Sequence, residues 1–385
     1  MRTPTTLTAT ALVLTTAIPA AAFEEDSLTI WTGNNRDRDQ LLAATAAFTE
    51  DLGIAVIVEV VDPDLPQNYQ QAAATGDGPD IVMWAHDRFG EWANGGLIQP
   101  VSPAAAWIEG VLPSAMEAVQ FDGNTWGYPV SVEAVTLVYN ADMIDTPPAS
   151  FEDIIASGEA NILWDYNNTY FTMPMLMAGG GYAFQRVDGS YDGTTTGVNT
   201  DGAIAGAETL AALFENDIMP EGVDYGVMDS AMAAGDVAMV LNGPWSWGGY
   251  ADAGINVAVA PIPTVDGNTA PPFLGVQTLG VNAATPNADL AVELIENYLL
   301  TDEGLATWNA NGALGALADI SAAEAQGDPL VSGMLAVAAD GVPMPSNPEM
   351  GAFWAAMAPA LTNITSGTSA PAEALNDAAA RILGE

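Results

Sequence analysis

The stretch AAATGDGPDIVMWAHDR, residues 72–88, contains the end of a helix, a turn and a complete strand. A helical pattern over residues 65–74 stops at TGDGP, residues 75–79, which is rich in turn formers. Residues 80–84 then form a short β-rich run. Because AHDR, residues 85–88, follows directly, we expect a carboxylate and a guanidinium at the carboxyl end of this strand.

Strands and helices also alternate upstream of this stretch. Residues 28–31 and 54–61 are β-rich, and residues 37–48 between them have apolar side chains at helical spacing. This alternation indicates βαβ units and a parallel sheet. In such sheets ligands bind beyond the carboxyl ends of the strands. Residues 34–36 and 85–88 are therefore expected at one edge of the same sheet.

The downstream pattern is extended at first and then mainly helical. Residues 126–140 form a β-branched run with Glu133 in its middle, and a carboxylate in an apolar run needs a partner. A hairpin turn is expected near residues 188–189, and a strand followed by a turn at residues 242–245. Residues 371–383 have the pattern of an amphipathic terminal helix.

The composition excludes several classes of chemistry. The chain has 385 residues, which favours two domains, with no cysteine, one histidine and six basic residues, all of them arginine. Without lysine there is no P-loop lysine and no Schiff base, and without cysteine there is no thiol catalysis. A zinc site built from several histidines is impossible. We therefore expect no cofactor and no metal.

The charge is strongly acidic. With 49 acidic residues the formal net charge is −43, which argues against nucleic acid or anionic lipid as a partner. An acidic surface over an apolar core suits a halophilic source, because salt screens the repulsion. We state this as a hypothesis that thermal melting with and without molar salt tests.

The first 22 residues have the features of a secretory signal. Arg2 precedes an apolar core, and AAA at residues 20–22 provides a small-residue cleavage site. No later uncharged run reaches the roughly 20 residues of a membrane span. Since no cysteine is present to carry a lipid, we expect a mature protein that is exported and free in a bacterial periplasm.

Two of the rare arginines come close after tryptophans. Arg36 follows Trp31, and Arg88 follows Trp84 in the segment that also holds His86. Further aromatic side chains stand near turns at Tyr170, Phe171, Trp245 and Trp354. Aromatic faces with charged or amide side chains beside them are what sugar rings and their hydroxyls require.

Several motifs in the same order resemble the periplasmic maltose/maltodextrin-binding protein family, the solute receptors of ABC importers. The motifs are AATGDGPD (73–80), WAHDRFG (84–90), YN (139–140), YFT (170–172), GGYAF (180–184), NGPW (242–245) and ENYLLTDEGL (296–305). The resemblance covers nearly the whole chain after residue 22. It implies an α/β fold of the two-lobe periplasmic-binding-protein type (class II), with a ligand cleft between lobes that are joined by crossover strands.

The resemblance also implies domain boundaries and partners. Residues 1–22 would be the signal peptide, residues 23–131 and 279–323 the N-lobe, and residues 132–278 and 324–385 the C-lobe. The receptor would be a monomer that captures an α-glucoside by hinge closure and delivers it to the permease subunits of an ABC transporter.

The family's ligand contacts can be carried over residue by residue. The expected contacts are Asn35, Arg36, Trp84, Ala85, Asp87, Arg88, Glu133, Asn168, Tyr170, Phe171, Trp245 and Trp354. The sequence also departs from the family, with Asn168 in place of a glutamate, Ala355 of a tyrosine and Ala358 of an arginine. In the resemblance these positions lie on one side of the cleft, so we expect that side to be wider and less charged. We therefore expect an α-glucoside other than maltose, such as trehalose or a longer maltodextrin. His86 is expected to be structural.

Two alternatives remain at this point. A secreted glycoside hydrolase could use Asp87 and Glu133 as its carboxyl pair, although Arg88 is expected to hold the pKa of Asp87 low. A receptor of the same fold could instead bind a ligand that is not a glucoside. The receptor, which is no enzyme, is the preferred interpretation.

Overall fold

The computed structural model describes residues 23–24, 26–33, 38–61, 64–159, 161–187 and 190–385. The predicted signal peptide therefore lies outside the described residues, and so do Asn35 and Arg36. Within them no helix is both long enough and apolar enough to cross a membrane.

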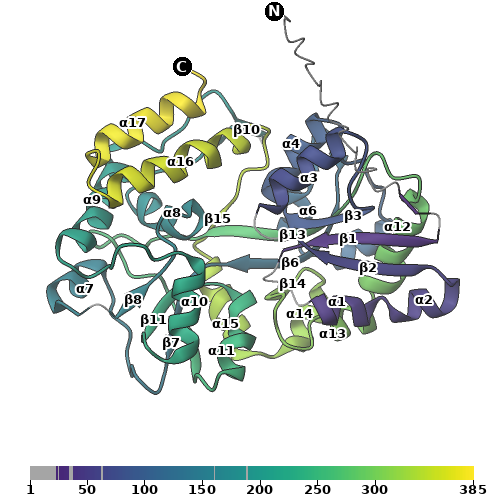
Figure 1. Ribbon diagram of the computed structural model, residues 1–385, viewed down its shortest axis with the longest axis horizontal. Coiled ribbons are helices and arrows are strands. Elements are labelled where there is room, and N and C mark those ends of the chain that lie inside the picture. Colours follow the sequence, from purple (N-terminus) through teal and green to yellow (C-terminus); the bar gives the residue numbers. More distant parts are fainter. Residues whose placement is uncertain (1–22, 25, 34–37, 62–63, 160, 188–189) are drawn as a thin grey trace, which may run out of the picture.

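The larger sheet has seven strands and lies on the right in Figure 1. Its order is β14-β6-β13-β3-β1-β2, and β15 pairs with β13. The strands are β1 Ser27–Thr32, β2 Ala55–Val60, β3 Ile81–Ala85, β6 Tyr128–Ala134, β13 Phe273–Val281, β14 Ala316–Leu317 and β15 Val342–Pro343.

The predicted parallel sheet is confirmed only around β1. β1 pairs in parallel with β2 and β3, so the ends of β1 and β3 lie at the same edge. The long strand β13 then inserts between β3 and β6 and is antiparallel to both, which makes the sheet mixed. The alternation of strands and helices in the first 88 residues gave no sign of this insertion, because β13 comes from almost 200 residues further along the chain.

The smaller sheet has four strands in the order β12-β7-β11-β8. The strands are β7 Thr136–Asn140, β8 Ile162–Leu163, β11 Met239–Asn242 and β12 Val257–Ala260. β7 begins two residues after the end of β6, so the extended run predicted over residues 126–140 passes from the larger sheet into the smaller one. Two short hairpins, β4 Gln120–Phe121 with β5 Asn124–Thr125 and β9 Gln185–Val187 with β10 Ser190–Asp192, lie outside both sheets. The second flanks the turn predicted near residues 188–189.

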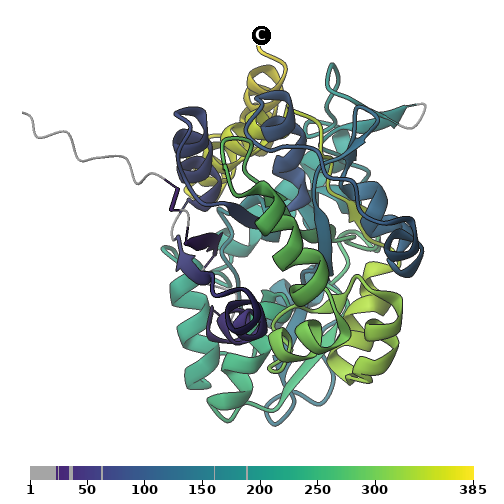
Figure 2. The ribbon, with the colours of Figure 1, turned by 90° about the vertical axis from the view of Figure 1, so that its right-hand side faces the viewer.

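Helices pack around both sheets, as Figures 1 and 2 show. Those associated with the larger sheet are α1 Arg38–Ala44, α2 Ala46–Leu52, α3 Leu65–Ala74, α4 Phe89–Asn94, α5 Ala105–Gly110, α6 Pro113–Ala118, α12 Ala288–Leu294, α13 Asp302–Trp308 and α14 Ile320–Gln326. Those associated with the smaller sheet are α7 Phe151–Ser157, α8 Thr169–Ala178, α9 Asp201–Glu215, α10 Tyr225–Ala234, α11 Trp247–Asp252, α15 Pro329–Ala338, α16 Met350–Thr365 and α17 Pro371–Ile382.

The terminal helix α17 is amphipathic, as its pattern predicted. Its buried side chains include Leu375, Ala378 and Ile382, which recur at helical spacing and join the apolar cluster around the smaller sheet. Burying one such leucine contributes about 1.5–3 kcal/mol. A separate apolar cluster around Leu28 and Ile30 supports the larger sheet.

Gly90 in α4 is required by a close backbone approach. A β-carbon at this position would lie 1.7 Å from the carbonyl oxygen of Ser346. The absence of a side chain therefore lets the segment before α16 pass directly against the helix that follows β3, and this contact brings Trp354 of α16 near the β3 end.

Candidate functional site

One cavity of about 860 Å³ is lined by elements of both sheets. Ten of the twelve predicted contacts line it: Trp84, Ala85, Asp87, Arg88, Glu133, Asn168, Tyr170, Phe171, Trp245 and Trp354. The other two, Asn35 and Arg36, lie outside the described residues. The structure thus brings the described candidates together from distant parts of the chain, and their role as ligand contacts remains a prediction.

Asp87 lies in the 3₁₀ turn η1, His86–Arg88, directly after β3. Its side chain is buried, and its Oδ2 accepts a hydrogen bond of 2.8 Å from the indole Nε1 of Trp354 in α16. Burial raises the pKa of Asp87 to about 6, although the charge of Arg88 and the bond from Trp354 both lower it. The prediction that Arg88 holds this pKa low was wrong, because desolvation of the carboxylate outweighs the attraction.

Arg88 is held in place by two neighbours. Its Nη2 lies 2.6 Å from Oε2 of Glu91, one turn further along, and donates a 3.3 Å bond to Oε1 of Gln70. Gln70 in turn donates to Glu91 at 3.0 Å. Glu91 and not Asp87 is therefore the ion-pair partner of Arg88, so the Asp87 carboxylate keeps its lone pairs for Trp354 and the cavity.

His86 has a structural position, as predicted. The backbone N–H of Val276 donates to Nδ1 at 3.1 Å, so Nε2 carries the proton and donates to the carbonyl of Met344 at 2.9 Å. Burial lowers the pKa of His86 to about 4. The neutral ring thus joins β3, β13 and the segment before α16 behind the cavity wall.

Glu133 has the partner that its place in an apolar run requires. Gln277 of β13 donates from Nε2 to Oε1 of Glu133 at 2.7 Å, and both side chains are buried. Gly275 stands opposite Glu133 in the pairing of β13 with β6 and leaves room for the carboxylate. The pair places one carboxylate and one amide at the cavity wall.

Aromatic rings line the side of the cavity next to the smaller sheet. The ring centroid of Trp245, in the 3₁₀ turn η2 (Pro244–Ser246), lies 6.2 Å from that of Tyr170 and 6.3 Å from that of Phe171. Trp354 packs edge-on against Phe353, with centroids 4.9 Å apart. These rings and the carboxylates of Asp87 and Glu133 line the same cavity.

Asn168 acts as the N-cap of α8. Its Oδ1 accepts the backbone N–H of Tyr170 at 3.1 Å, which fixes the first turn that carries Tyr170 and Phe171. Asp165 stands just before it in the cavity wall, and burial is the main cause of its raised pKa.

The sequence reasoning missed several residues of this cavity wall. They are Gly33, Asp64, Pro66, Gln67, Met83, Asp165, Asp224, Tyr225, Gly226, Gln277 and Met344. Gln277 had a usable signal, because it is a polar side chain inside the apolar strand FLGVQTLGV, just as Glu133 is in its own strand. Asp224 had none, because an aspartate at the N-cap of a helix such as α10 is explained by capping alone.

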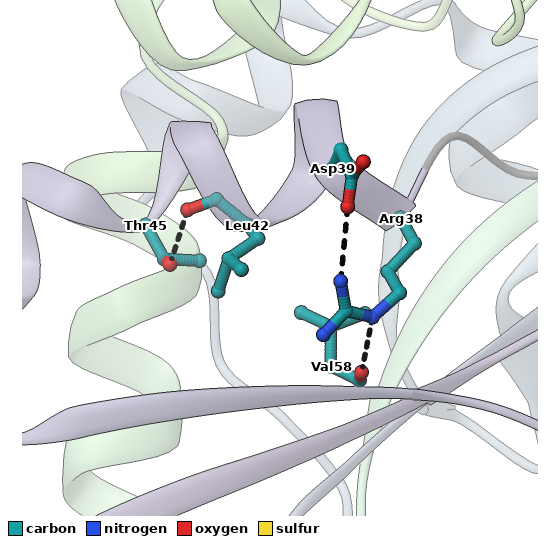
Figure 3. A network of polar contacts seen from close by, with 5 residues as sticks. All are labelled: Arg38, Asp39, Leu42, Thr45 and Val58. Atoms are coloured by element: carbon teal, nitrogen blue, oxygen red, sulfur yellow. Dashed lines mark hydrogen bonds and ion pairs between the residues drawn. The ribbon is translucent and has the colours of Figure 1, made fainter.

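The other described arginines with ion pairs belong to the scaffold. Arg38 donates from Nε to the carbonyl of Val58 at 3.0 Å and from Nη1 to Asp39 at 2.9 Å, which ties α1 to β2 (Figure 3). Arg186 pairs with Glu117 of α6. Within the described part of the chain no group of histidine and acidic residues could hold a metal ion.

This chain resembles known proteins that are described as solute-binding or sugar-binding proteins. The model of a family described as bacterial extracellular solute-binding protein matches residues 43–333. A maltotriose-binding protein of Pyrococcus abyssi is 28% identical over 87% of this chain and 76% of its own length. A galactooligosaccharide-binding protein of Bacillus subtilis is 25% identical (93% and 89%), and a maltooligosaccharide ABC transporter solute-binding lipoprotein of Streptococcus pneumoniae is 25% identical (79% and 75%).

Proposed function

Because the chain belongs to the bacterial extracellular solute-binding proteins, we propose that it is a receptor that captures an α-glucoside and delivers it to an ABC importer. The sequence resemblance to maltose/maltodextrin receptors is confirmed by the relatives, which are named as binding proteins for maltotriose or maltooligosaccharides. The chain is thus a binding protein and no enzyme, and the hydrolase alternative is set aside.

The cavity wall is the observation that carries the proposal. One side presents the carboxylates of Asp87 and Glu133 with the guanidinium of Arg88, and the other presents the rings of Tyr170 and Trp245. Charged side chains bind sugar hydroxyls and aromatic faces pack on the ring carbons. The volume of about 860 Å³ lies within the roughly 300–1,000 Å³ of small-molecule sites.

We propose two lobes that close on the ligand. Residues 23–131 with 279–323 would form one lobe and residues 132–278 with 324–385 the other. The proposed boundaries at residues 131/132 and 278/279 fall inside β6 and β13, so these strands would be the crossovers. A sugar that contacts side chains of both lobes stabilises the closed state by its differential affinity.

For the ligand we propose a class of sugars rather than one sugar. Asn168 uses its side-chain oxygen as a helix cap. Asp165 and Asp224 also line the cavity, whereas the alanines at positions 355 and 358 are not among its lining residues. The proposal of an α-glucoside other than maltose, such as trehalose or a longer maltodextrin, rests on the departures from the family at positions 168, 355 and 358. One relative is named for galactooligosaccharides, so a galactoside belongs in any binding test.

The proposal also covers the export, location, oligomeric state and membrane partner of the protein. Export through a cleaved signal peptide at residues 1–22, a periplasmic location, a monomeric state and a membrane permease as partner follow from the family's role. Mass spectrometry of the exported protein tests the cleavage, with Phe23 expected as the first residue.

Isothermal titration calorimetry tests the proposed function. The panel is maltose, trehalose, sucrose, maltotriose, glucose and a galactooligosaccharide, added to the purified chain. We expect micromolar or tighter binding of at least one α-glucoside. Binding of the galactooligosaccharide alone would replace the proposed ligand class, and no binding in the panel would overturn the sugar receptor.

A further inference from the structure

A second polar side chain of the central sheet stands beside Glu133 in the cavity wall. Gln277 lines the cavity and donates to Glu133 at 2.7 Å, yet neither the family's predicted contacts nor the relatives point to it. An amide has two N–H donors and a carbonyl acceptor, and the bond to Glu133 uses one donor. Within the described residues the Gln277 side chain makes no other hydrogen bond.

The strand geometry around Gln277 is irregular. On β13, Gln277 pairs with Ser131 but Thr278 pairs with Pro129, so Val130 of β6 is an extra residue. Such bulges increase the local twist and redirect side chains, and they are frequent beside functional sites. The bulge lies where β13 passes between Glu133 on β6 and Ala85 on β3, the strand that leads to Asp87.

The neighbouring positions make room for the pair. Gly275 lies two residues before Gln277 on the same face of β13, opposite Glu133. A β-carbon there would lie 3.1 Å from Cγ of Glu133 and 3.3 Å from its Oε1. A glycine at this position therefore lets Glu133 reach toward the diagonal neighbour Gln277.

From this arrangement we propose that Gln277 is a specificity-determining ligand contact that works together with Glu133. The Gln277 amide orients the Glu133 carboxylate and also binds a sugar hydroxyl itself. Glu133 and Gln277 together then bind two neighbouring hydroxyls of one sugar ring. This inference rests on the proposed sugar-receptor function. The chemistry is that of a carboxylate, which only accepts, beside an amide, which both accepts and donates.

The first variant removes the amide and keeps the length of the side chain. In Gln277→Met, we expect the affinity for maltotriose, or for the panel sugar that binds most tightly, to fall about ten- to a hundredfold. The reason is that the buried Glu133 carboxylate loses the donor that orients it and the sugar loses a hydrogen-bond partner. Gln99→Met is the matched control, since the Gln99 amide bonds the carbonyl of Asn282 away from the cavity. Its affinity should equal that of the wild type.

The second variant separates ligand contact from simple support of the fold. Gln277→Glu keeps the shape but places a second carboxyl group beside Glu133, and two carboxylates at this distance repel each other when both are ionised. We expect its sugar affinity to increase as the pH falls from 8 to 5, relative to the wild type at each pH. A residue that only supports the fold would lower the melting temperature without this pH profile.

The possible outcomes distinguish a failure of the proposed sugar-receptor function from a failure of the proposed role of Gln277. A wild-type protein that binds no sugar of the panel overturns the proposed function and this inference with it. A wild type that binds, together with a Gln277→Met variant of equal affinity or a Gln277→Glu variant without the pH profile, overturns the role of Gln277 alone.

Discussion

Trp354 donates its indole N–H to the carboxylate of Asp87 over 2.8 Å, although 267 positions separate the two residues in the chain. Trp354 lies in α16, which packs with the apolar cluster of the smaller sheet, and Asp87 follows β3 of the larger sheet. The bond therefore connects the two halves of the cavity wall.

Replacing Trp354 by phenylalanine tests this connection. Trp354→Phe keeps an aromatic ring but removes the N–H donor that orients the Asp87 carboxylate at the cavity wall. With the carboxylate less well positioned for a sugar hydroxyl, we expect sugar affinity to fall about tenfold, which corresponds to about 1.4 kcal/mol. Trp126→Phe is the control, because the Trp126 indole N–H bonds the carbonyl of Phe121 outside the cavity. Equal affinities of the two variants in calorimetry would contradict the role of Trp354.

The raised pKa of Asp87 predicts a pH-dependent affinity. With a pKa of about 6 in the folded protein, Asp87 is a full acceptor for sugar hydroxyls above this pH and becomes protonated below it. We expect binding to weaken as the pH falls from 7 to 5. Asp87→Asn should bind more weakly at pH 7 and should lose this dependence, and an unchanged slope in the variant would assign the effect to another group.

The lowered pKa of His86 predicts that the folded protein loses stability in acid. Its pKa in the fold, about 4, is below the ordinary value of 6.5, so the unfolded chain binds the proton more readily. The stabilising contribution is complete above pH 6.5 and is lost as the pH falls through 4, with a size of about 3 kcal/mol at most. Urea unfolding should therefore show a steeper decline between pH 6.5 and 4.5 in the wild type than in His86→Gln.

Asp87 acts on stability in the opposite direction over part of this range. The pKa of Asp87 is raised from 3.8 to about 6 in the folded protein. The contribution of its protonated carboxyl group to stability is therefore complete below pH 3.8 and is lost as the pH rises through 6. The comparison of His86→Gln with the wild type removes this shared contribution. Parallel pH profiles of the two proteins would contradict the assignment to His86.

Gly90 predicts a strong steric effect. In Gly90→Ala the new β-carbon would meet the Ser346 carbonyl, so we expect the free energy of unfolding to fall by about 2 kcal/mol or more. Gly249→Ala in α11 is the control, since no heavy atom lies within 4 Å of its added β-carbon. Thermal melting should show a lower midpoint for Gly90→Ala only.

The acidic composition predicts stabilisation by salt. A net charge of −43 repels itself most in the compact state, and molar salt screens this repulsion. We expect the melting temperature to rise between 0.1 and about 2 M sodium chloride. Greater stability at low salt would refute the halophile hypothesis.

The sequence predicted the described elements between residues 27 and 88 closely, because local patterns define them. The helix over residues 65–74 has the predicted bounds, and β3 is shifted by one residue. The helical pattern over residues 37–48 divides at Thr45 into α1 and α2, where the Thr45 hydroxyl bonds the carbonyl of Leu42. The spacing of apolar residues does not reveal such a break.

The site was predicted as a set of residues but not as a set of interactions. Motifs identified ten predicted contacts that line one cavity, whereas Gln277 and Trp354 reach Glu133 and Asp87 through tertiary contacts. The pairing of Arg88 with Glu91, one helical turn away, is local. The pKa of Asp87 depends on burial, which the neighbouring Arg88 in the sequence did not indicate.

Calorimetric titration of the purified wild-type chain with the sugar panel at pH 7 tests the central claim most directly. The account predicts saturable 1:1 binding of an α-glucoside, with micromolar or tighter affinity, that Trp354→Phe weakens and Trp126→Phe leaves unchanged. Absence of heat with every sugar of the panel, or equal affinity in both tryptophan variants, would contradict it.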